Sequence, residues 1–465
     1  MTEQQHDAQA SAASSPRVAF ITLGCAKNEV DTDRMKALIA ASPFTLVDDA
    51  DEADVAVVNT CSFLVAAVEE GVETIFDVLN SQGFNRNHGK LVVAGCMPSR
   101  YGEDLSDELA EAAAFLPVDQ EDSIVSVVAD LTGVPCPQLN NPLDRGAAAL
   151  YGQPLRSEVG PSAYVKISDG CDRYCSFCTI PYIRGHYQSR PYEQIADEVA
   201  ALQAMGAKEV VLIGQDTGVW GEDLPEAPSI ADLLEKLAQR FPDLWIRVLY
   251  LQPEGITERL LEVMGGHDNI CSYFDIPVQH SVARILHDMN RGGSTDEYLQ
   301  VVARIRERVP NAVLRTTVMA GFPGETDDDI DELVGFLEEA RFDFTGVFAY
   351  SQEDGTVAGR RSDQVDPEVR EERAERLRDV ADSIGFARTG EHVGQVLEVL
   401  VESYDEDGEA GSVLGRTRGQ APEVDGQVHI ADARRPDGSP VVPGDIVKVS
   451  IDDAYCYELE GEVVS

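Results

Sequence analysis

The sequence has little positive charge and no long apolar run. Its 465 residues hold 37 Lys and Arg against 83 Asp and Glu, a formal net charge of −46. Phosphate backbones and anionic membrane surfaces repel such a chain, so general nucleic-acid binding would need a local basic patch, and the sequence shows none. The charge therefore favours a basic macromolecular partner.

No apolar stretch approaches the roughly 18 residues of a membrane-spanning helix. Residues 1–16 are polar and lack the basic and apolar regions of a signal peptide, so we expect a disordered tail there and a cytoplasmic protein. The nine cysteines are odd in number and scattered along the chain. In a reducing compartment this pattern argues against a disulfide framework and favours metal binding or catalysis.

The pattern of apolar runs predicts an α/β protein. Over 17–134, runs at 18–23, 54–58 and 90–94 alternate with helical stretches, which indicates a parallel sheet covered on both faces. Residues 135–162 are rich in Pro, Gly and Asn and form a predicted linker.

Over 163–388 the sequence predicts a partial (β/α)6 barrel with a charged connector helix at its end. In such barrels the chemistry belongs at the carboxyl ends of the strands. The expected strands lie at 164–167, 209–213, 245–249, 273–276, 313–318 and 346–349, the clearest helices at 192–205 and 327–340, and the connector at 366–387.

Residues 389–465 change to short strands separated by turn signals, which predicts a small antiparallel β-barrel. The segment 391–465 holds 5 basic and 17 acidic residues. This surplus of acidic groups opposes contact with a phosphate backbone.

The most specific motif is Cys171-Asp-Arg-Tyr-Cys175-Ser-Phe-Cys178, directly after the first barrel strand. Three thiolates on one tight loop hold three irons of a [4Fe–4S] cube and leave the fourth iron open. A zinc site would need a fourth protein ligand, and His186 lies beyond the loop.

A second set of thiols ends the three apolar runs of the N-terminal segment. Cys25 follows Leu23-Gly24, Cys61 follows Asn59-Thr60, and Cys96 follows Ala94-Gly95. If the strands are parallel neighbours, these thiols meet at one sheet edge and predict a second cluster with an open iron. Cys136, Cys271 and Cys456 have no partner spacing and are interpreted as structural thiols.

The cysteine loop and two further stretches resemble the radical S-adenosylmethionine (SAM) superfamily. The stretches are Ile213-Gly-Gln-Asp-Thr217 after the second strand and Gly321-Phe-Pro-Gly-Glu325-Thr326 after the fifth. The resemblance implies that the open iron chelates SAM, which is cleaved reductively to a 5′-deoxyadenosyl radical. It also implies a set of cofactor-binding residues: Phe177, Gly214, Gln215, Asp216, Gly321, Gly324 and Glu325.

Two open-iron clusters followed by a small β domain resemble the methylthiotransferase family over Val18–Ser465. The resemblance implies an auxiliary-cluster domain, a radical SAM barrel and a TRAM domain that recognises substrate. It implies conversion of C–H to C–S–CH₃ with two SAM molecules, one as radical source and one as methyl donor. Sulfur would pass through the auxiliary cluster, and an external sulfur donor and a low-potential electron donor would be partners.

Two branches of that family compete. The RimO-type branch modifies the β-carbon of an aspartate in small-subunit ribosomal protein S-twelve, and the MiaB-like branch modifies N6-isopentenyladenosine in tRNA. The stretch Thr22-Leu-Gly-Cys-Ala-Lys-Asn28 resembles the RimO type, as do Tyr273–His280 and Phe348–Thr356. The acidic C-terminal segment agrees, because ribosomal proteins are basic and tRNA is not.

Three arginines are candidates for orienting the target carboxylate, since a guanidinium binds a carboxylate through two parallel hydrogen bonds. They are Arg184, Arg190 and Arg315. Besides the tRNA branch, a non-enzymatic iron–sulfur electron carrier and a zinc-binding interaction module remain alternatives. SAM cleavage would separate the enzyme from the carrier, and visible absorbance would separate iron–sulfur clusters from zinc.

Overall fold

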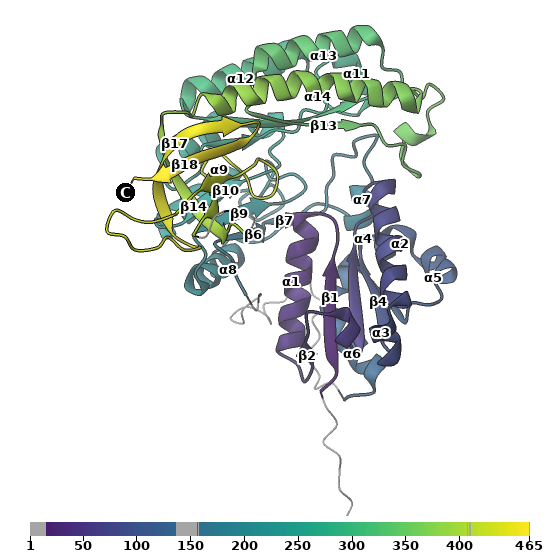
Figure 1. Cartoon of the computed structure of the whole chain (residues 1–465). Helices are drawn as coiled ribbons and strands as arrows, with labels where there is room; N and C mark the ends of the chain where they lie inside the picture. Colours follow the sequence, from purple (N-terminus) through teal and green to yellow (C-terminus); the bar gives the residue numbers. More distant parts are fainter. Residues whose placement is uncertain (1–14, 136–155, 157, 407, 409–410, 465) are drawn as a thin grey trace, which may run out of the picture. The chain divides into compact units, whose positions relative to one another are not determined.

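The computed structural model describes residues 15–135, 156, 158–406, 408 and 411–464 (Figure 1). Residues 1–14 of the tail expected over 1–16, most of the linker expected over 135–162, and Cys136 lie outside these residues. The chain forms two compact units. Of the described residues, the first comprises 15–62, 66–135 and 156, and the second comprises 63–65 and those from 158 to 464.

The first unit contains a parallel five-stranded sheet in the order β2-β1-β3-β4-β5. Its strands are β1 (Arg17–Thr22), β2 (Thr45–Leu46), β3 (Val55–Thr60), β4 (Lys90–Gly95) and β5 (Ala114–Pro117). Its α-helices are α1 (Ala26–Ala40), α2 (Val65–Asn80), α3 (Gln82–Arg86), α4 (Cys96–Tyr101), α5 (Glu103–Glu108) and α6 (Ile124–Thr132).

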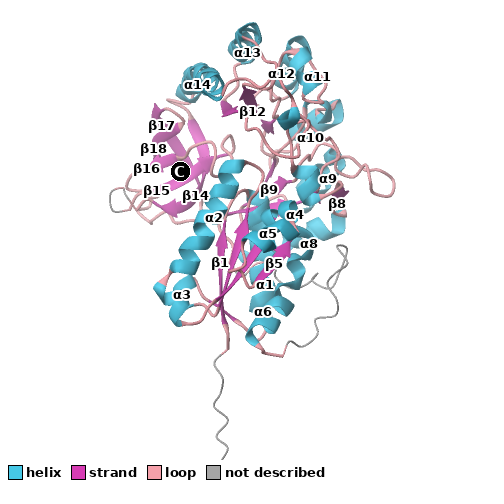
Figure 2. Cartoon of the chain, turned by 90° about the vertical axis from the view of Figure 1, so that its right-hand side faces the viewer, coloured by secondary structure: helices cyan, strands magenta, loops and turns pink. Residues whose placement is uncertain are grey.

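Both faces of this sheet are covered, as the apolar runs predict. Val55 and Val57 of β3 pack in one core with α1 and α6, whereas Ala56 and Val58 pack in a second core with α2 and α3. Successive side chains of a strand point to opposite faces, so every residue of β3 is buried. Figure 2 shows α3 and α6 on opposite sides of the strands.

The second unit begins with the expected partial barrel of six parallel strands. They form two three-stranded sheets, β6-β9-β10 and β11-β12-β13, which a bridge between Ile246 and Ile270 connects. The strands are β6 (Ser162–Lys166), β9 (Glu209–Ile213), β10 (Trp245–Val248), β11 (Tyr273–Asp275), β12 (Val313–Ala320) and β13 (Phe344–Ala349). A short antiparallel pair, β7 (Ser168–Asp169) and β8 (Gln188–Ser189), follows β6.

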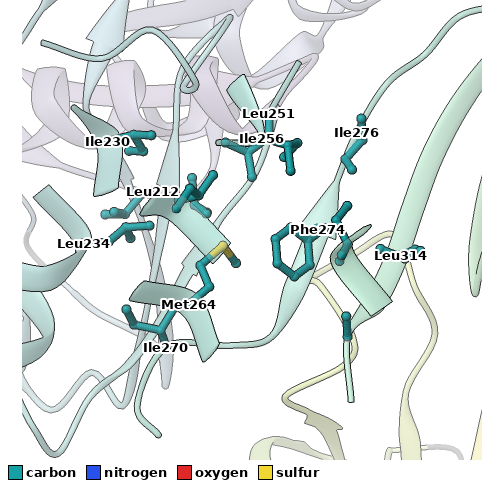
Figure 3. Packing of buried hydrophobic residues seen from close by; sticks show 14 of the residues in the cluster. Leu212, Ile230, Leu234, Leu251, Ile256, Met264, Ile270, Phe274, Ile276 and Leu314 are labelled. Carbon is teal, nitrogen blue, oxygen red and sulfur yellow. The ribbon is translucent and has the colours of Figure 1, made fainter. Parts of the chain in front are cut away.

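Helices cover this barrel and fix its strands. They are α7 (Ile180–Arg184), α8 (Tyr192–Met205), α9 (Ile230–Arg240), α10 (Glu258–Gly266), α11 (Ala283–Asp288), α12 (Thr295–Arg308), α13 (Asp327–Ala340) and α14 (Pro367–Gly390). Figure 3 shows Leu212 and Phe274 from the strands in one apolar layer with Leu234 of α9 and Met264 of α10. Helix α14 packs on α13 and lies along β13 (Figure 1).

The chain ends in the expected small β-barrel, which is closed in the order β14-β15-β16-β18-β17. Its strands are β14 (Val396–Tyr404), β15 (Val413–Thr417), β16 (Val428–Ile430), β17 (Ile446–Tyr455) and β18 (Glu458–Val463). The pairings are antiparallel except that β16 runs parallel to β18. Alternate residues of β17, Val447, Val449 and Ile451, fill the barrel core.

Buried charges join the two barrels of the second unit. Glu209, the first residue of β9, contacts Arg247 of β10 at 2.8 Å and Arg416 of β15 at 2.5 Å, and all three side chains are inaccessible to solvent or nearly so. Burial alone would raise the pKa of Glu209, but the two guanidinium groups lower it to about 2. The charged glutamate therefore connects both barrels.

In the part of the chain that the structure describes, no helix combines the length and apolar character needed to cross a membrane.

Candidate cluster and cofactor sites

The loop after β6 and β7 brings the three barrel cysteines together. Cys171 is held by a hydrogen bond from its backbone N to Gly185 O (3.2 Å), and Cys178 N donates to Cys175 O (3.0 Å). The three residues are neither fully buried nor fully exposed. The backbone thus folds the motif into one tight turn at the carboxyl edge of the barrel strands, as the sequence predicts.

The surroundings of these sulfurs fit a bound metal. Desolvation raises the pKa of the Cys171 thiol and raises that of Cys178 to about 12. Thiols with such pKa values stay protonated at neutral pH unless a cation binds the sulfur. A half-buried set of three thiols therefore suits an iron cluster, which deprotonates its ligands.

The stretch after β9 lies beside the cysteine loop. Asp216 forms an ion pair with Arg173 of that loop, and burial raises the pKa of Asp216 despite this partner. Gln215 Nε2 donates to Asp169 Oδ1 at 3.3 Å, while its buried Oε1 has no hydrogen-bond partner among the described residues. A Cβ on Gly214 would lie 2.4 Å from Ser168 Oγ and would displace that hydroxyl.

The glycine-rich loop after β12 is built around Glu325. Gly321 has φ +79°, and its backbone N donates to Glu325 Oε1 at 2.8 Å. Arg373 of α14 also contacts Oε1, at 3.0 Å, while Glu325 Oε2 lies 3.5 Å from His280 Nε2. Gly324, at φ +80°, donates to Asp363 O and completes the turn. The buried carboxylate therefore fixes the backbone of this loop.

His280, which the sequence analysis did not single out, has a defined tautomer. Its Nδ1 accepts hydrogen bonds from Ser281 N (3.0 Å) and Val282 N (3.1 Å). The proton of the neutral ring must then lie on Nε2, toward Glu325. A histidine after a strand carries no signal of such a contact, because the partner is 45 residues away in the sequence.

Phe177 connects the cysteine loop to the glycine-rich loop. Its partly buried ring packs against an apolar cluster that includes Phe322, Val282 and Met289. Phe322 follows Gly321 directly, so the two loops share this small core. The structure thus places the seven predicted cofactor-binding residues on three neighbouring loops. The orphaned Gln215 oxygen and the cradle at Gly214 fit a polar cofactor such as SAM.

The N-terminal cysteines meet at the carboxyl edge of the first unit's sheet. Gly24 has φ +97°, and a Cβ there would lie 3.2 Å from Cys61 Sγ. Asn28 donates from Nδ2 to the carbonyls of Leu23 and Thr60, each at 3.0 Å, and its Oδ1 lies 3.6 Å from Cys96 Sγ. One asparagine thus contacts the ends of three neighbouring strands. Cys61 and Cys96 are buried and Cys25 is exposed.

Neither cysteine set resembles the site of a single ion. Among the described residues no group of three or more His, Cys, Asp or Glu side chains lies close enough to hold one metal ion. In a [4Fe–4S] cube each thiolate binds a different iron, so its ligands are spaced more widely.

The three candidate arginines have structural partners. Arg184 lies 3.4 Å from Asp169, and Arg190 lies 2.7 Å from Glu198. Arg315 contacts Asp425 of the C-terminal barrel at 3.1 Å. It is also six residues before Gly321 along β12, about 20 Å from the cofactor edge at 3.3 Å per residue. We therefore assign Arg315 to the contact between the barrels rather than to the substrate.

Family models match three parts of the chain. The radical SAM superfamily matches residues 165–337, the uncharacterized protein family UPF0004 matches 17–117, and the TRAM domain matches 393–464.

Curated relatives match over nearly the full length. The ribosomal protein uS12 methylthiotransferase RimO of Symbiobacterium thermophilum is 43% identical over 450 residues, which cover 96% of this chain and 90% of the relative. The protein of the same name from Natranaerobius thermophilus is 40% identical and covers 97% of this chain and 99% of its own.

A solved structure shows the same fold at low identity. It is the radical SAM methyltransferase TsrM of Kitasatospora setae with cobalamin and a [4Fe–4S] cluster bound. Its TM-score is 0.54 at 14% identity, and the match covers 74% of this chain and 77% of that chain.

Proposed function

The chain belongs to the RimO family of methylthiotransferases, which are radical SAM enzymes that act on ribosomal protein uS12, and from this premise we propose which residues carry the reaction. The protein is a transferase of sulfur-containing groups with SAM and [4Fe–4S] clusters as cofactors. The proposed target is the β-carbon of an aspartate, where C–H becomes C–S–CH₃.

Cys171, Cys175 and Cys178 are the proposed ligands of the cluster that takes SAM. When bound, this cluster and SAM supply the radical that removes hydrogen from the target carbon. The observation that carries the proposal is the meeting of the cysteine loop, Gly214–Asp216 and Gly321–Glu325 at one barrel edge, through the contacts of Arg173 and Phe177.

The protein's own groups would orient SAM and exclude water. Gln215 offers its unpartnered Oε1 to a donor such as an ammonium group. Glu325 would fix the turn at Gly321 beside the ligand by accepting the backbone N–H of Gly321. Phe177 and Phe322 supply the apolar wall that keeps water from the reacting atoms.

Cys25, Cys61 and Cys96 are the proposed ligands of the auxiliary cluster through which sulfur passes. A sulfur donor and a low-potential electron donor complete the reaction, and we place the protein in the cytoplasm. The acidic C-terminal segment supports a basic protein substrate rather than tRNA, because residues 391–465 include 5 basic and 17 acidic residues.

Mass spectrometry of uS12 from cells with and without this gene tests the function. We expect one aspartate to be heavier by about 46 Da, the mass of SCH₃ less that of H, only when the gene is present. SAM labelled in its methyl group should deliver label to protein. Label found in RNA instead would establish the tRNA branch and contradict the proposal.

A further inference from the structure

The segment 288–291, which begins at the last residue of α11, contacts the cysteine loop. Ser176 lies between the second and third cysteines and donates to this segment twice. Its backbone N bonds Met289 O at 2.9 Å, and its Oγ bonds Asp288 O at 2.8 Å. The loop is therefore held from the side of α11 as well as through its own turn.

Asn290 holds the other half of the loop. Its side-chain Nδ2 donates to the carbonyls of Arg173 (3.0 Å) and Tyr174 (3.1 Å), between the first and second cysteines. Asn290 itself has φ +58°, a left-handed conformation that asparagine adopts more readily than most residues. This turn directs the next residue, Arg291, back toward the sulfurs.

Arg291 donates from Nη1 to Cys175 Sγ at 3.8 Å. Its other terminal nitrogen, Nη2, donates to Pro277 O at 2.8 Å and to Gln252 Oε1. These acceptors lie in the loops after β11 and β10, so the guanidinium is fixed by the barrel edge itself. The planar group holds Nη1 toward the sulfur while Nη2 bonds to two acceptors of the barrel edge, and the buried Nε has no hydrogen-bond partner among the described residues.

The charge of Arg291 is not neutralised by an acid. Among the described residues no carboxylate lies within ion-pairing distance of it, whereas Arg173 of the same region pairs with Asp216 and Glu254. In a chain with net charge −46, an unpaired cation directed at a thiol is unusual. Its field acts on the sulfur that it contacts.

We propose that Arg291 is a positioning residue that donates a hydrogen bond to Cys175 Sγ and favours the reduced state of the cluster on this loop. The inference rests on the proposed function, in which Cys175 is a cluster ligand. Reduction adds one electron, taken from a low-potential one-electron donor, to a cluster that three thiolates already make electron-rich. Hydrogen bonds to the ligand sulfurs stabilise that added charge and raise the reduction potential.

The test compares R291Q with R291K and with R376Q as matched control. Arg376 is exposed on α14 and, among the described residues, pairs only with Asp331, so R376Q removes the same charge away from the loop. Each variant is made in the full chain with Cys25, Cys61 and Cys96 replaced by alanine, so that one cluster remains. The cluster is reconstituted anaerobically, its iron is counted, and its midpoint potential is measured by titration with dithionite and electron paramagnetic resonance.

We expect R291Q to lower the reduced-to-oxidised ratio about tenfold at fixed potential, which is about 59 mV for a one-electron couple. R291K should show a smaller shift, because the charge remains and the fork geometry is lost, and R376Q should match the parent. The potential is measured only on molecules that hold a cluster, so partial iron loss in a variant does not mask the result. An unchanged midpoint potential in R291Q would overturn the inference.

Two further variants separate this inference from the proposed function. Asn290→Gly keeps the turn and removes the two bonds to the loop, so we expect less iron retained at an unchanged potential. Cys175→Ala should lose the cluster. If Cys175→Ala kept a full iron complement, the ligand assignment itself would fail. If it lost iron and R291Q kept the parental potential, only the role of Arg291 would fail.

Discussion

Cys175 and Cys61 are the residues at which the two proposed clusters can be tested independently. Cys175 lies in the barrel loop between two segments that the structure holds in place, and Cys61 is buried at the edge of a different sheet. Both thiols come from short motifs that the sequence displays directly. What the sequence does not display is the set of groups around them, such as Asn28, Asn290 and Arg291.

Cys175→Ala should abolish reductive SAM cleavage, because two remaining thiolates cannot hold the cube with its open iron in place. The measurement is 5′-deoxyadenosine released by the reduced, reconstituted protein. Cys456→Ser is the control, since Cys456 is exposed and belongs to neither cysteine set. Normal 5′-deoxyadenosine output from Cys175→Ala would refute the assignment.

Cys61→Ala should leave part of the SAM cleavage intact and stop methylthio transfer, because the change affects only the cluster proposed to pass sulfur. Product is followed by mass spectrometry of uS12 incubated with the enzyme, and SAM cleavage is followed in the same samples. Methylthiolated product from this variant would show that sulfur takes another route.

At the scale of elements, the end of β4 shows how closely the sheet edge of the first unit is packed. Gly95 has φ +88° and caps α4, and a Cβ there would lie 2.1 Å from Asn59 Oδ1 and 2.8 Å from Thr60 O. The sequence shows a glycine before each of Cys25 and Cys96 but gives no reason for it. The structure supplies the reason at Gly95, which is the close approach of β3.

Gly95→Ala should destabilise the first unit by about 3 kcal/mol, from backbone strain and the clash with β3. Chemical denaturation of the whole chain measures the loss. Gly102→Ala is a matched control, because Gly102 also has positive φ (+55°) and nothing lies within 4 Å of its added Cβ. It should cost less, about 2 kcal/mol, from backbone strain alone. Equal losses in the two variants would contradict the packing argument.

The predicted elements agree with the structure where the periodicity is long. Helices expected at 192–205 and 327–340 have those bounds as α8 and α13, because each buries one apolar stripe over about four turns. The β7–β8 pair was missed, since two residues per strand give no periodic signal. The parallel pairing of β16 with β18 was missed as well, because strand order is not encoded in local pattern.

At the scale of the whole second unit, the Glu209 network fixes the C-terminal barrel to the (β/α) barrel. Arg416 of β15 also contacts Glu402 at 2.6 Å, and Tyr273 of β11 hydrogen-bonds Asp425. Removing one partner of a buried ion pair is costly because the other charges remain buried without compensation. This network makes the C-terminal barrel a fixed part of the second unit.

Glu209→Gln should lower the free energy of unfolding by about 3 kcal/mol at neutral pH, since two buried guanidinium groups would face a neutral amide. Denaturant titration measures the change, and Glu398→Gln is a matched control. Glu398 is part of an exposed pair with Arg418, which contributes at most about 1 kcal/mol. Similar losses in the two variants would show that burial of the network does not increase its contribution to the free energy of unfolding.

Acid should weaken the same contact. The pKa of Glu209 is lowered from 4.5 to about 2 in the folded chain, so its stabilising contribution is fully present above pH 4.5 and is lost as pH falls toward 2. The free energy of unfolding should therefore fall more steeply over this window in the parent than in Glu209→Gln. Parallel pH profiles of the two proteins would contradict the prediction.

The sequence by itself determined the cysteine motifs, the succession of strands and helices along the chain, and the excess of acidic residues that opposes a phosphate-rich partner. Motif spacing and periodicity are local properties of the chain, and net charge is a sum over its residues. Only the tertiary structure decided which side chains surround the sulfurs. Asn28, Arg291 and His280 act through partners distant in the sequence, and parallel strands bring such residues to one edge only once the sheet is formed. Arg315 is assigned to the contact between the barrels for the same reason. The sequence predicts its place on β12, but it does not predict that Asp425 lies beside it.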